Sequence, residues 1–249
     1  MKTFSLKKTA KRGLIVAALL IAAGQTLAVA WKMSGSEEWE LEIDRNGVQV
    51  YSYKEPGRST KLFKGVTTGN YTQSQIVASL MLDNDDLQNC KDWIPVCSEL
   101  EVIEPYNDKA QGDSVLWTLE LMPGLFTSRE YLIKSHAAQD PVTKVASIDI
   151  IATANKIPLN DCCVRITHIH NRWQISPAKE GKVKVELVQD FGMGGFFPDV
   201  LVNFTSAEET YKMFHDKLPG LLNKDKYRNA RFDYIDEGAG ATPLAVASR

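Results

Sequence analysis

Apolar and polar residues alternate with a period of two through the middle of the chain, between turns rich in Gly, Pro, Asn and Asp. The pattern predicts six strands, at residues 98–106, 112–122, 129–138, 144–154, 164–176 and 182–191. Two earlier strands, at residues 48–53 and 60–68, flank turn residues and form a hairpin. Because strands joined by short connections are usually antiparallel neighbours, we expect one antiparallel sheet.

Helical periodicity appears before this run of strands. Thr72 can cap a helix over residues 73–82, and residues 84–90 form a second short helix in this interpretation. Residues 31–46 are polar with scattered Trp and Leu, and we expect a short helix there as well.

The longest helix is expected after Gly192-Met193-Gly194-Gly195, where Pro198 stands at a position that a first helical turn tolerates. Pro219-Gly220 should break or kink this helix late. Its apolar residues recur at helical spacing: Phe197, Val200, Leu201, Phe204, Tyr211, Phe214, Leu218 and Leu221. Together these elements predict an α+β arrangement, in which a curled sheet wraps around one amphipathic helix and leaves a cavity.

The first thirty residues differ from the rest of the chain. A basic run precedes an uninterrupted apolar stretch at residues 13–24, and Ala28-Val29-Ala30 follows. This order is typical of a secretory signal peptide cleaved before Trp31. The alternative is an uncleaved anchor, but a spanning helix needs about 20 apolar residues and this stretch has 12. We expect a signal peptide at residues 1–30, one domain at residues 31–235 and a disordered tail at residues 236–249.

Removal of the signal makes the chain acidic. The whole chain has 29 basic and 31 acidic residues, and the loss of five basic residues leaves 24 against 31, a net charge of −7. Such a surface argues against nucleic acid as a partner and against electrostatic docking on anionic lipid headgroups.

The four cysteines are Cys90, Cys97, Cys162 and Cys163. In an oxidising compartment an even number favours disulfides. Cys90 and Cys97 flank the same turn and are the preferred pair, although either could instead bond to Cys162 or Cys163. These spacings match no usual zinc pattern, and we expect neither a metal site nor a cofactor.

No catalytic arrangement stands out in the sequence. A G-x-S-x-G elbow is absent, and the Gly-rich segment at residues 192–195 lacks the Lys and Ser/Thr of a phosphate loop, so we interpret it as a hinge. His168 and His170 share one face of a strand, which would suit a metal or proton site, but their neighbours are those of an ordinary strand. The aromatic residues Trp117 and Phe191 fit a packed core and a ligand cavity equally well.

Six segments resemble the StAR-related lipid-transfer (START) family, in particular its exported bacterial branch. They are WELEIDRNGVQVY at residues 39–51, FKGVTT at 63–68, DWIPVCSELEVIE at 92–104, SREYLI at 128–133, NRWQISP at 171–177 and GGFFP at 194–198. The family commonly has a Pro-x-x-x-Arg-Asp segment at the start of a central strand. Here Pro123 precedes Arg129, and Glu130 replaces the Asp. The resemblance covers about 195 residues, from Trp39 to about Asp233.

The resemblance implies a helix-grip fold of the START/Bet v 1-like type, a curved antiparallel sheet around a long C-terminal helix that encloses a hydrophobic cavity. Family members bind one lipid, such as a sterol, phospholipid or ceramide, and many lack catalytic activity. We therefore expect a non-enzymatic, monomeric lipid-binding or lipid-transfer protein that is exported to the periplasm or secreted and makes transient membrane contact. The alternative is a cyclase- or aromatase-like enzyme on the same fold, with His168, His170 or Asp149 inside the cavity.

Under this resemblance the expected ligand-binding residues are Trp117, Glu120, Arg129, Phe191, Phe197, Val200, Leu201 and Phe204. Arg129 is expected to pair with Glu120 or Glu130 near the polar end of the ligand. Ser135 stands where some animal members have a second basic residue, which departs from their sterol-headgroup recognition. In the family the C-terminal helix and nearby loops form a gate, which here corresponds to residues 191–204 hinged on Gly192, Gly194 and Gly195.

Overall fold

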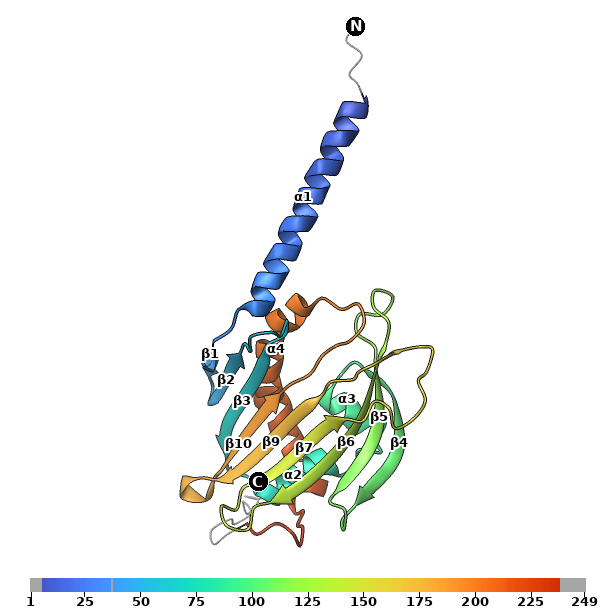
Figure 1. Cartoon of the computed structure of the whole chain (residues 1–249). Coiled ribbons are helices and arrows are strands. Elements are labelled where there is room, and N and C mark those ends of the chain that lie inside the picture. The colour runs from blue at the N-terminus through green and yellow to red at the C-terminus, as the bar shows by residue number, and fades with distance from the viewer. Residues whose placement is uncertain (1–5, 37, 238–249) are drawn as a thin grey trace.

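The computed structural model describes residues 6–36 and 38–237 of the chain (Figure 1). Its helices are α1 (Leu6–Met33), α2 (Gln73–Met81), α3 (Leu87–Trp93), α4 (Asp199–Lys212), α5 (Leu218–Leu222) and α6 (Asp225–Arg228), with a 3-10 turn η1 (Lys179–Gly181) and a π-helical turn η2 (Met213–Lys217). Its strands are β1 (Glu40–Arg45), β2 (Val48–Tyr53), β3 (Leu62–Gly69), β4 (Cys97–Asn107), β5 (Gly112–Leu119), β6 (Arg129–Gln139), β7 (Ala146–Ala152), β8 (Val164–Arg165), β9 (His170–Pro177) and β10 (Val183–Gln189).

The strands form one curved sheet, and its long axis follows the order β1-β2-β3-β10-β9-β7-β6-β5-β4. Neighbours along this order are antiparallel, whereas β8 pairs with β6 in parallel. Helices α2, α3 and α4 lie on one face of the sheet (Figure 1). The predicted α+β helix-grip architecture is confirmed.

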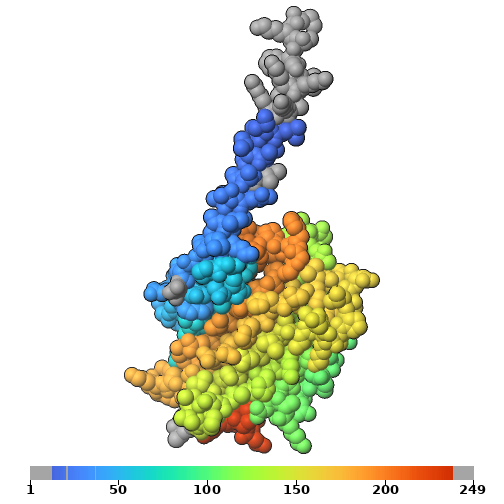
Figure 2. All heavy atoms as spheres, viewed as in Figure 1, coloured from blue at the N-terminus to red at the C-terminus, as the bar shows by residue number. Residues whose placement is uncertain are grey.

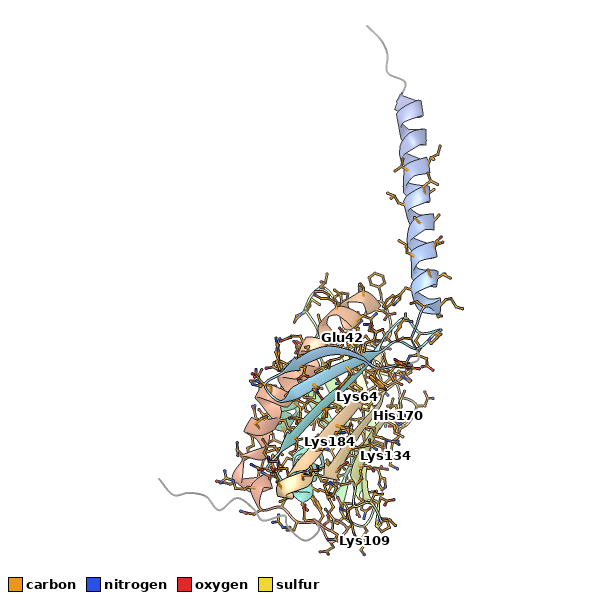
Figure 3. All side chains as sticks on the ribbon, turned by 90° about the vertical axis from the view of Figure 1, so that its left-hand side faces the viewer. Glu42, Lys64, Lys109, Lys134, His170 and Lys184 are labelled. Carbon is orange, nitrogen blue, oxygen red and sulfur yellow. A yellow bond between two sulfur atoms is a disulfide. The ribbon has the colours of Figure 1, made fainter. Side chains whose placement is uncertain are left out.

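The opposite face of the sheet is exposed to solvent. Lys64, Lys134, His170 and Lys184 project from it (Figure 3). Alternate residues of β2 and β10 are buried on the helix side, which is the pattern of an antiparallel sheet with one solvated face.

The C-terminal helical segment packs closely against the sheet. The Phe214 ring stacks on Trp173 of β9 with 5.7 Å between ring centroids. A Cβ at Gly65 of β3 would lie 2.4 Å from the Phe214 ring, so the close approach of helix and sheet requires glycine there. The buried core extends from this contact to α2 and α5.

The two short helices are held by local side-chain contacts. Thr72 and Gln75 form a capping box at the start of α2, which confirms the predicted cap. The Cys90–Cys97 disulfide links α3 to the start of β4, so the preferred pairing is confirmed. The remaining disulfide joins the adjacent residues Cys162 and Cys163.

Two predicted elements were wrong in detail, and the break or kink expected near Pro219 corresponds to a change in helix type. Residues 40–45 form strand β1 and not the end of a helix. Because β1 lies at the edge of the sheet and most of its side chains are exposed, its sequence lacks the alternation of apolar and polar residues that marks a half-buried strand. The strand expected at 164–176 is divided, because its first part pairs with β6 and its second part with β7 and β10. The C-terminal helix continues through Pro219 after widening into η2, where the Leu218 N–H donates to the Met213 carbonyl.

Helix α1 projects away from the globular part (Figure 2). It is longer than the apolar stretch suggested: Gly13–Met33 is long and apolar enough to cross a membrane, and a signal sequence has the same character. Among the described side chains of α1, those at its C-terminal end contact the domain. Trp31 Nε1 donates to the Ser59 carbonyl at 2.8 Å, and the buried Lys54 ammonium donates to the Lys32 and Ser34 carbonyls.

The predicted tail begins inside the described part of the chain. The Glu237 carboxylate accepts hydrogen bonds from the backbone N–H groups of Gln73 and Ser74, in the first turn of α2. The Asp236 carboxylate pairs with Lys144 at 2.8 Å. These two residues therefore belong to the domain, and the rest of the predicted tail, from residue 238, lies outside the described residues.

Candidate functional site

A cavity of about 500 Å³ lies between the sheet and α4. Its volume is in the usual range for small-molecule sites. The apolar wall comes from Ile94, Val96, Trp117, Leu119, Leu121, Met122, Tyr131, Ile133, Ile150, Ile169, Phe191, Met193, Phe197, Leu201 and Val202. The polar lining residues are Asn171, Gln189, Thr205, Ser206 and Glu209.

The register of β5 against β6 builds the far wall. Trp117 lies directly opposite Tyr131, so both side chains point to the same face of the sheet. The Tyr131 hydroxyl donates to Met193 Sδ at 3.2 Å. Burial raises the pKa of Tyr131, so its hydroxyl stays neutral and contributes no charge to the cavity.

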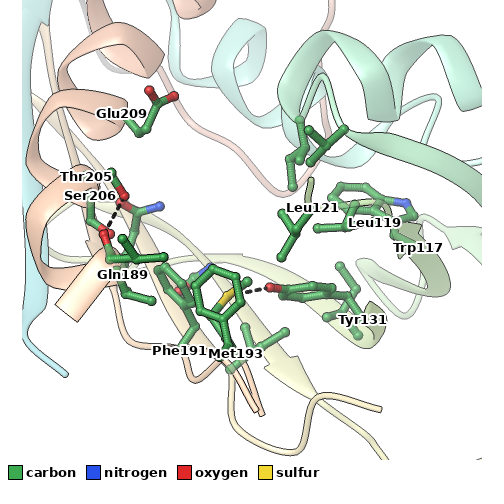
Figure 4. A pocket seen from close by; sticks show the side chains of 18 of the residues that line it. Trp117, Leu119, Leu121, Tyr131, Gln189, Phe191, Met193, Thr205, Ser206 and Glu209 are labelled. Carbon is green, nitrogen blue, oxygen red and sulfur yellow. Dashed lines mark hydrogen bonds between the residues drawn. The ribbon is translucent and has the colours of Figure 1, made fainter. Parts of the chain in front are cut away.

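The polar residues gather on the α4 side of the cavity. Figure 4 shows Gln189, Thr205, Ser206 and Glu209 on this side, across the cavity from Trp117 and Leu119. Gln189 Oε1 accepts a hydrogen bond from the Thr210 hydroxyl at 2.7 Å. Glu209 is the one carboxylate among the described lining residues, and it pairs with Lys212 at 2.8 Å. The cavity is thus apolar with one polar end.

Arg129 lies behind the mouth of the cavity and is 1% exposed. Its guanidinium donates to the carbonyls of Thr127, Met193 and Phe196, and it lies over the rings of Phe126 and Phe197 at 5.7 and 5.2 Å. These contacts join the loop at residues 120–128 to the segment before α4.

Arg129 does not form the ion pair expected from the sequence. Glu130 instead pairs with Arg165, with 2.8 Å between Oε2 and Nε, and both side chains are buried. Glu120 is exposed and lies outside the cavity. The Arg129 guanidinium therefore donates to the backbone carbonyls of Thr127, Met193 and Phe196, and not to the carboxylate that was expected.

Several apolar residues are exposed in the two segments that flank the cavity, the loop at residues 120–128 and residues 196–204. Met122 and Leu201 line the cavity and are also partly exposed. Phe196, Val200 and Phe204 point to solvent with exposures of 87%, 69% and 85%, and Leu125 is also largely exposed. We call Met122, Leu125, Phe196, Val200 and Phe204 the apolar rim.

No family model matches the chain. An uncharacterized protein of Pseudomonas aeruginosa is 26% identical over 192 residues, which cover 76% of this chain and 85% of that protein. A crystal structure of a STAR-related lipid transfer protein fragment from Xanthomonas axonopodis superposes with a TM-score of 0.64 at 19% identity, covering 75% of this chain and 99% of that one. The chain has the fold of StAR-related lipid transfer domains. The structure of human StAR-related lipid transfer protein 5 is also similar, with a TM-score of 0.59 at 16% identity, covering 81% of this chain and 96% of that one.

In this START-like domain, four of the eight expected residues line the cavity. They are Trp117, Phe191, Phe197 and Leu201, and their contact with a ligand remains a prediction. The other four do not line it: Glu120, Arg129, Val200 and Phe204. Val200 and Phe204 lie on the outer side of α4, because the helix turns Thr205, Ser206 and Glu209 inward instead.

The residues proposed for acid–base chemistry lie outside the START-like cavity. His170 projects from the solvent face of the sheet, 3.6 Å from Asp149 (Figure 3). His168 Nε2 lies 2.7 Å from Asp190 Oδ1 and is half exposed. None of His168, His170 and Asp149 lines the cavity.

Glu130, Cys162 and Cys163 form the one group of potential metal ligands found among the described residues. Both sulfur atoms are joined in a disulfide, and the carboxylate is paired with Arg165. The arrangement therefore offers no free ligand to a metal ion.

Proposed function

We propose that the domain binds a hydrophobic ligand, such as a sterol, phospholipid or other lipid, and transfers it without catalysing a reaction. The apolar cavity between sheet and α4 carries this proposal. Burial of apolar surface contributes roughly 25 cal/mol per Å², so enclosure of a lipid needs no covalent chemistry. The one lining carboxylate is engaged with Lys212, which favours binding over acid–base catalysis.

The ligand enters, in this proposal, between the loop at residues 120–128 and the segment at residues 191–204. Gly194 and Gly195 adopt the left-handed backbone conformation that favours glycine, and they mark the hinge of this segment. Arg129 holds the two sides together through backbone carbonyls. Opening of the mouth requires these hydrogen bonds to break.

We also propose that the domain is exported and contacts membranes transiently through the apolar rim. Exposed apolar patches of this kind commonly mark interaction sites. The N-terminal apolar helix supports export, since a signal sequence has this length and composition. The rim residues belong to the two segments that flank the cavity, and Met122 also lines it, so in this proposal a lipid passes between membrane and cavity without crossing water.

Substitution in the cavity wall tests ligand binding. We expect the purified protein to carry a lipid in native mass spectrometry, and Leu201→Arg to abolish this binding because it places a charge in the apolar cavity. Phe204→Arg is the matched control, because it introduces the same charged residue into the same helix at a side chain that points to solvent. It should keep the lipid while weakening association with vesicles.

The outcomes separate the parts of the proposal. Absence of both co-purified and added lipid in the wild type would contradict the binding function. Equal binding by wild type and a folded Leu201→Arg variant would show that the ligand occupies another site. Unchanged vesicle association of Phe204→Arg would remove this residue from the membrane contact.

A further inference from the structure

A second cavity, of about 350 Å³, adjoins the main cavity. It lies between residues 93–96 and the helical segment from α4 to η2. The two cavities share Ile94, Val96, Gln189, Phe191, Ser206 and Glu209. Three of the shared residues, Gln189, Ser206 and Glu209, belong to the polar end of the main cavity. An amphiphile with its tail against the apolar wall would therefore have its head group next to the second cavity.

Lys217 is the one cation among the described residues that line either cavity. Its Nζ donates to the Trp93 carbonyl at 3.0 Å, and none of the described carboxylates forms an ion pair with it. Burial lowers the pKa of Lys217, and the charge of Glu209 opposes that shift. The side chain is therefore a partly desolvated ammonium without an anionic partner.

The hydrogen bond to the Trp93 carbonyl uses only part of the hydrogen-bond donor capacity of the Lys217 ammonium. A lysine commonly stabilises the terminal carbonyls of a helix, and Trp93 is the last residue of α3. An ammonium has three N–H donors, and this bond uses one of them. The others are available to a ligand in the second cavity.

Two carboxylates, Glu209 and Asp216, act on Lys217 through their charge without being bonded to its ammonium. Glu209 also lines both cavities, but its carboxylate is engaged with Lys212 at 2.8 Å. Asp216 lies 2.6 Å from His215 Nδ1, and neither it nor Glu209 forms an ion pair with the Lys217 ammonium. An anionic group beside Lys217 would supply the directly bonded partner that its ammonium lacks.

The π-helical turn η2 contributes to the position of Lys217. Pro219 has no N–H to donate to the carbonyl four residues earlier, and an ordinary helical turn would be strained there. The chain widens instead, with the Leu218 N–H bonded to the Met213 carbonyl. Turns of this type add a residue to the helix and are frequent at functional sites. Here the extra residue changes the direction in which Lys217 points from the helix axis, compared with a continuous α-helix.

We propose that Lys217 binds the anionic head group of an amphiphile whose apolar tail occupies the main cavity. This inference rests on the proposed lipid-binding function and adds the head-group chemistry to it. A carboxylate and a phosphate both supply suitable oxygen acceptors.

Three ligands with the same tail test the proposal: oleate, oleyl phosphate and oleyl alcohol. Each is titrated at pH 8 into the full-length or naturally processed protein, in competition with a neutral fluorescent probe. The wild type should prefer an anionic ligand over the alcohol by about tenfold, the size of one charge-assisted hydrogen bond. A preference between the two anions distinguishes a carboxylate from a phosphate head group.

Substitutions at Lys217 assign this preference to its charge. Lys217→Met should lose the preference and keep its affinity for oleyl alcohol, whereas Lys217→Arg should retain most of it. Lys184→Met, on the solvent face of the sheet, is the matched control and should behave as the wild type (Figure 3).

Two results would overturn the head-group site alone: a wild type that binds the alcohol as tightly as both anions, or a Lys217→Met variant that keeps the preference. Failure of all three ligands to bind would instead contradict the lipid-binding function. The wild-type comparison needs no variant, so it decides the question even if Lys217→Met does not fold.

Discussion

Arg129 has a buried positive charge that is balanced by backbone carbonyls and not by a carboxylate. Removal of a buried hydrogen-bonding partner commonly leaves acceptors unsatisfied at a cost of about 1–3 kcal/mol each. The acceptors here belong to the two chain segments on either side of the cavity mouth. The same side chain therefore affects stability and, if the mouth opens as proposed, the rate of ligand exchange.

Arg129→Met should lower the free energy of unfolding by about 2–4 kcal/mol and should speed ligand dissociation. Denaturant unfolding and stopped-flow displacement measure the two effects. Arg172→Met is a suitable control, because Arg172 is half exposed in its pair with Asp149 and should cost at most about 1 kcal/mol. A destabilised Arg129→Met variant with unchanged dissociation would limit Arg129 to a structural role and contradict the gate.

The sequence predicted part of this site because its aromatic residues coincide with sheet positions that face inward. Trp117 and Phe191 follow the period of two, so their side of the sheet could be inferred. Val200 and Phe204 were misplaced because the apolar stripe of a helix was assumed to face the core. In α4 the cavity side carries Leu201 and Val202 together with the polar residues Thr205, Ser206 and Glu209, whereas Val200 and Phe204 point to solvent. A single apolar stripe therefore does not mark the side of α4 that faces the cavity.

At the scale of elements, the Cys90–Cys97 disulfide supports one wall of the cavity. It joins α3 to β4, and two lining residues, Ile94 and Val96, lie between the cysteines. Both cysteines are buried. The bond therefore restricts a segment that lines both cavities.

Cys90→Ala/Cys97→Ala should lower the free energy of unfolding by about 2–3 kcal/mol, the effect expected for a short closed loop, and should weaken ligand binding. Cys162→Ala/Cys163→Ala is the matched control: adjacent residues close almost no loop, so the loss should be roughly 1 kcal/mol or less. Thermal or denaturant unfolding compares the two double variants. An equal loss in both would mean that loop closure does not explain the contribution of either bond.

Most elements could be predicted because periodicity and caps are local signals. Thr72 and Gln75 define the start of α2 within the sequence itself. The errors concern non-local pairing: β8 is set by its contact with β6 and β9 by its contacts with β7 and β10, which a single continuous period cannot reveal. Likewise, the widening at η2 accommodates Pro219 in a way that a simple break signal does not anticipate.

At the scale of the whole molecule, α1 lies at the same end of the domain as the first turn of α4 (Figure 1), and Leu201 of that turn lines the cavity. A chain of contacts connects them: the Ser59 carbonyl accepts from Trp31 Nε1 and also from Asn203 Nδ2 of α4. If α1 stayed in a membrane, the apolar rim would be held near that same membrane. If α1 were removed, the domain would be a free carrier.

We expect removal of α1 before Trp31. The contacts that attach this segment to the domain come from Trp31, Lys32 and Ser34, so cleavage after Ala30 leaves them intact. Intact mass of the protein from its native host should therefore give a chain beginning at Trp31, in the soluble exported fraction.

Signal peptidases require small residues at the first and third positions before the cleaved bond. Ala30→Leu should therefore block processing and retain the protein in the membrane fraction, whereas Val29→Leu, between the two small residues, should be processed normally. A full-length wild-type protein in the membrane fraction would contradict the signal-peptide prediction. In that case the base of α1, fixed to the domain through Trp31 and Lys54, would act as a short stalk, and ligand exchange would be confined to membranes within its reach.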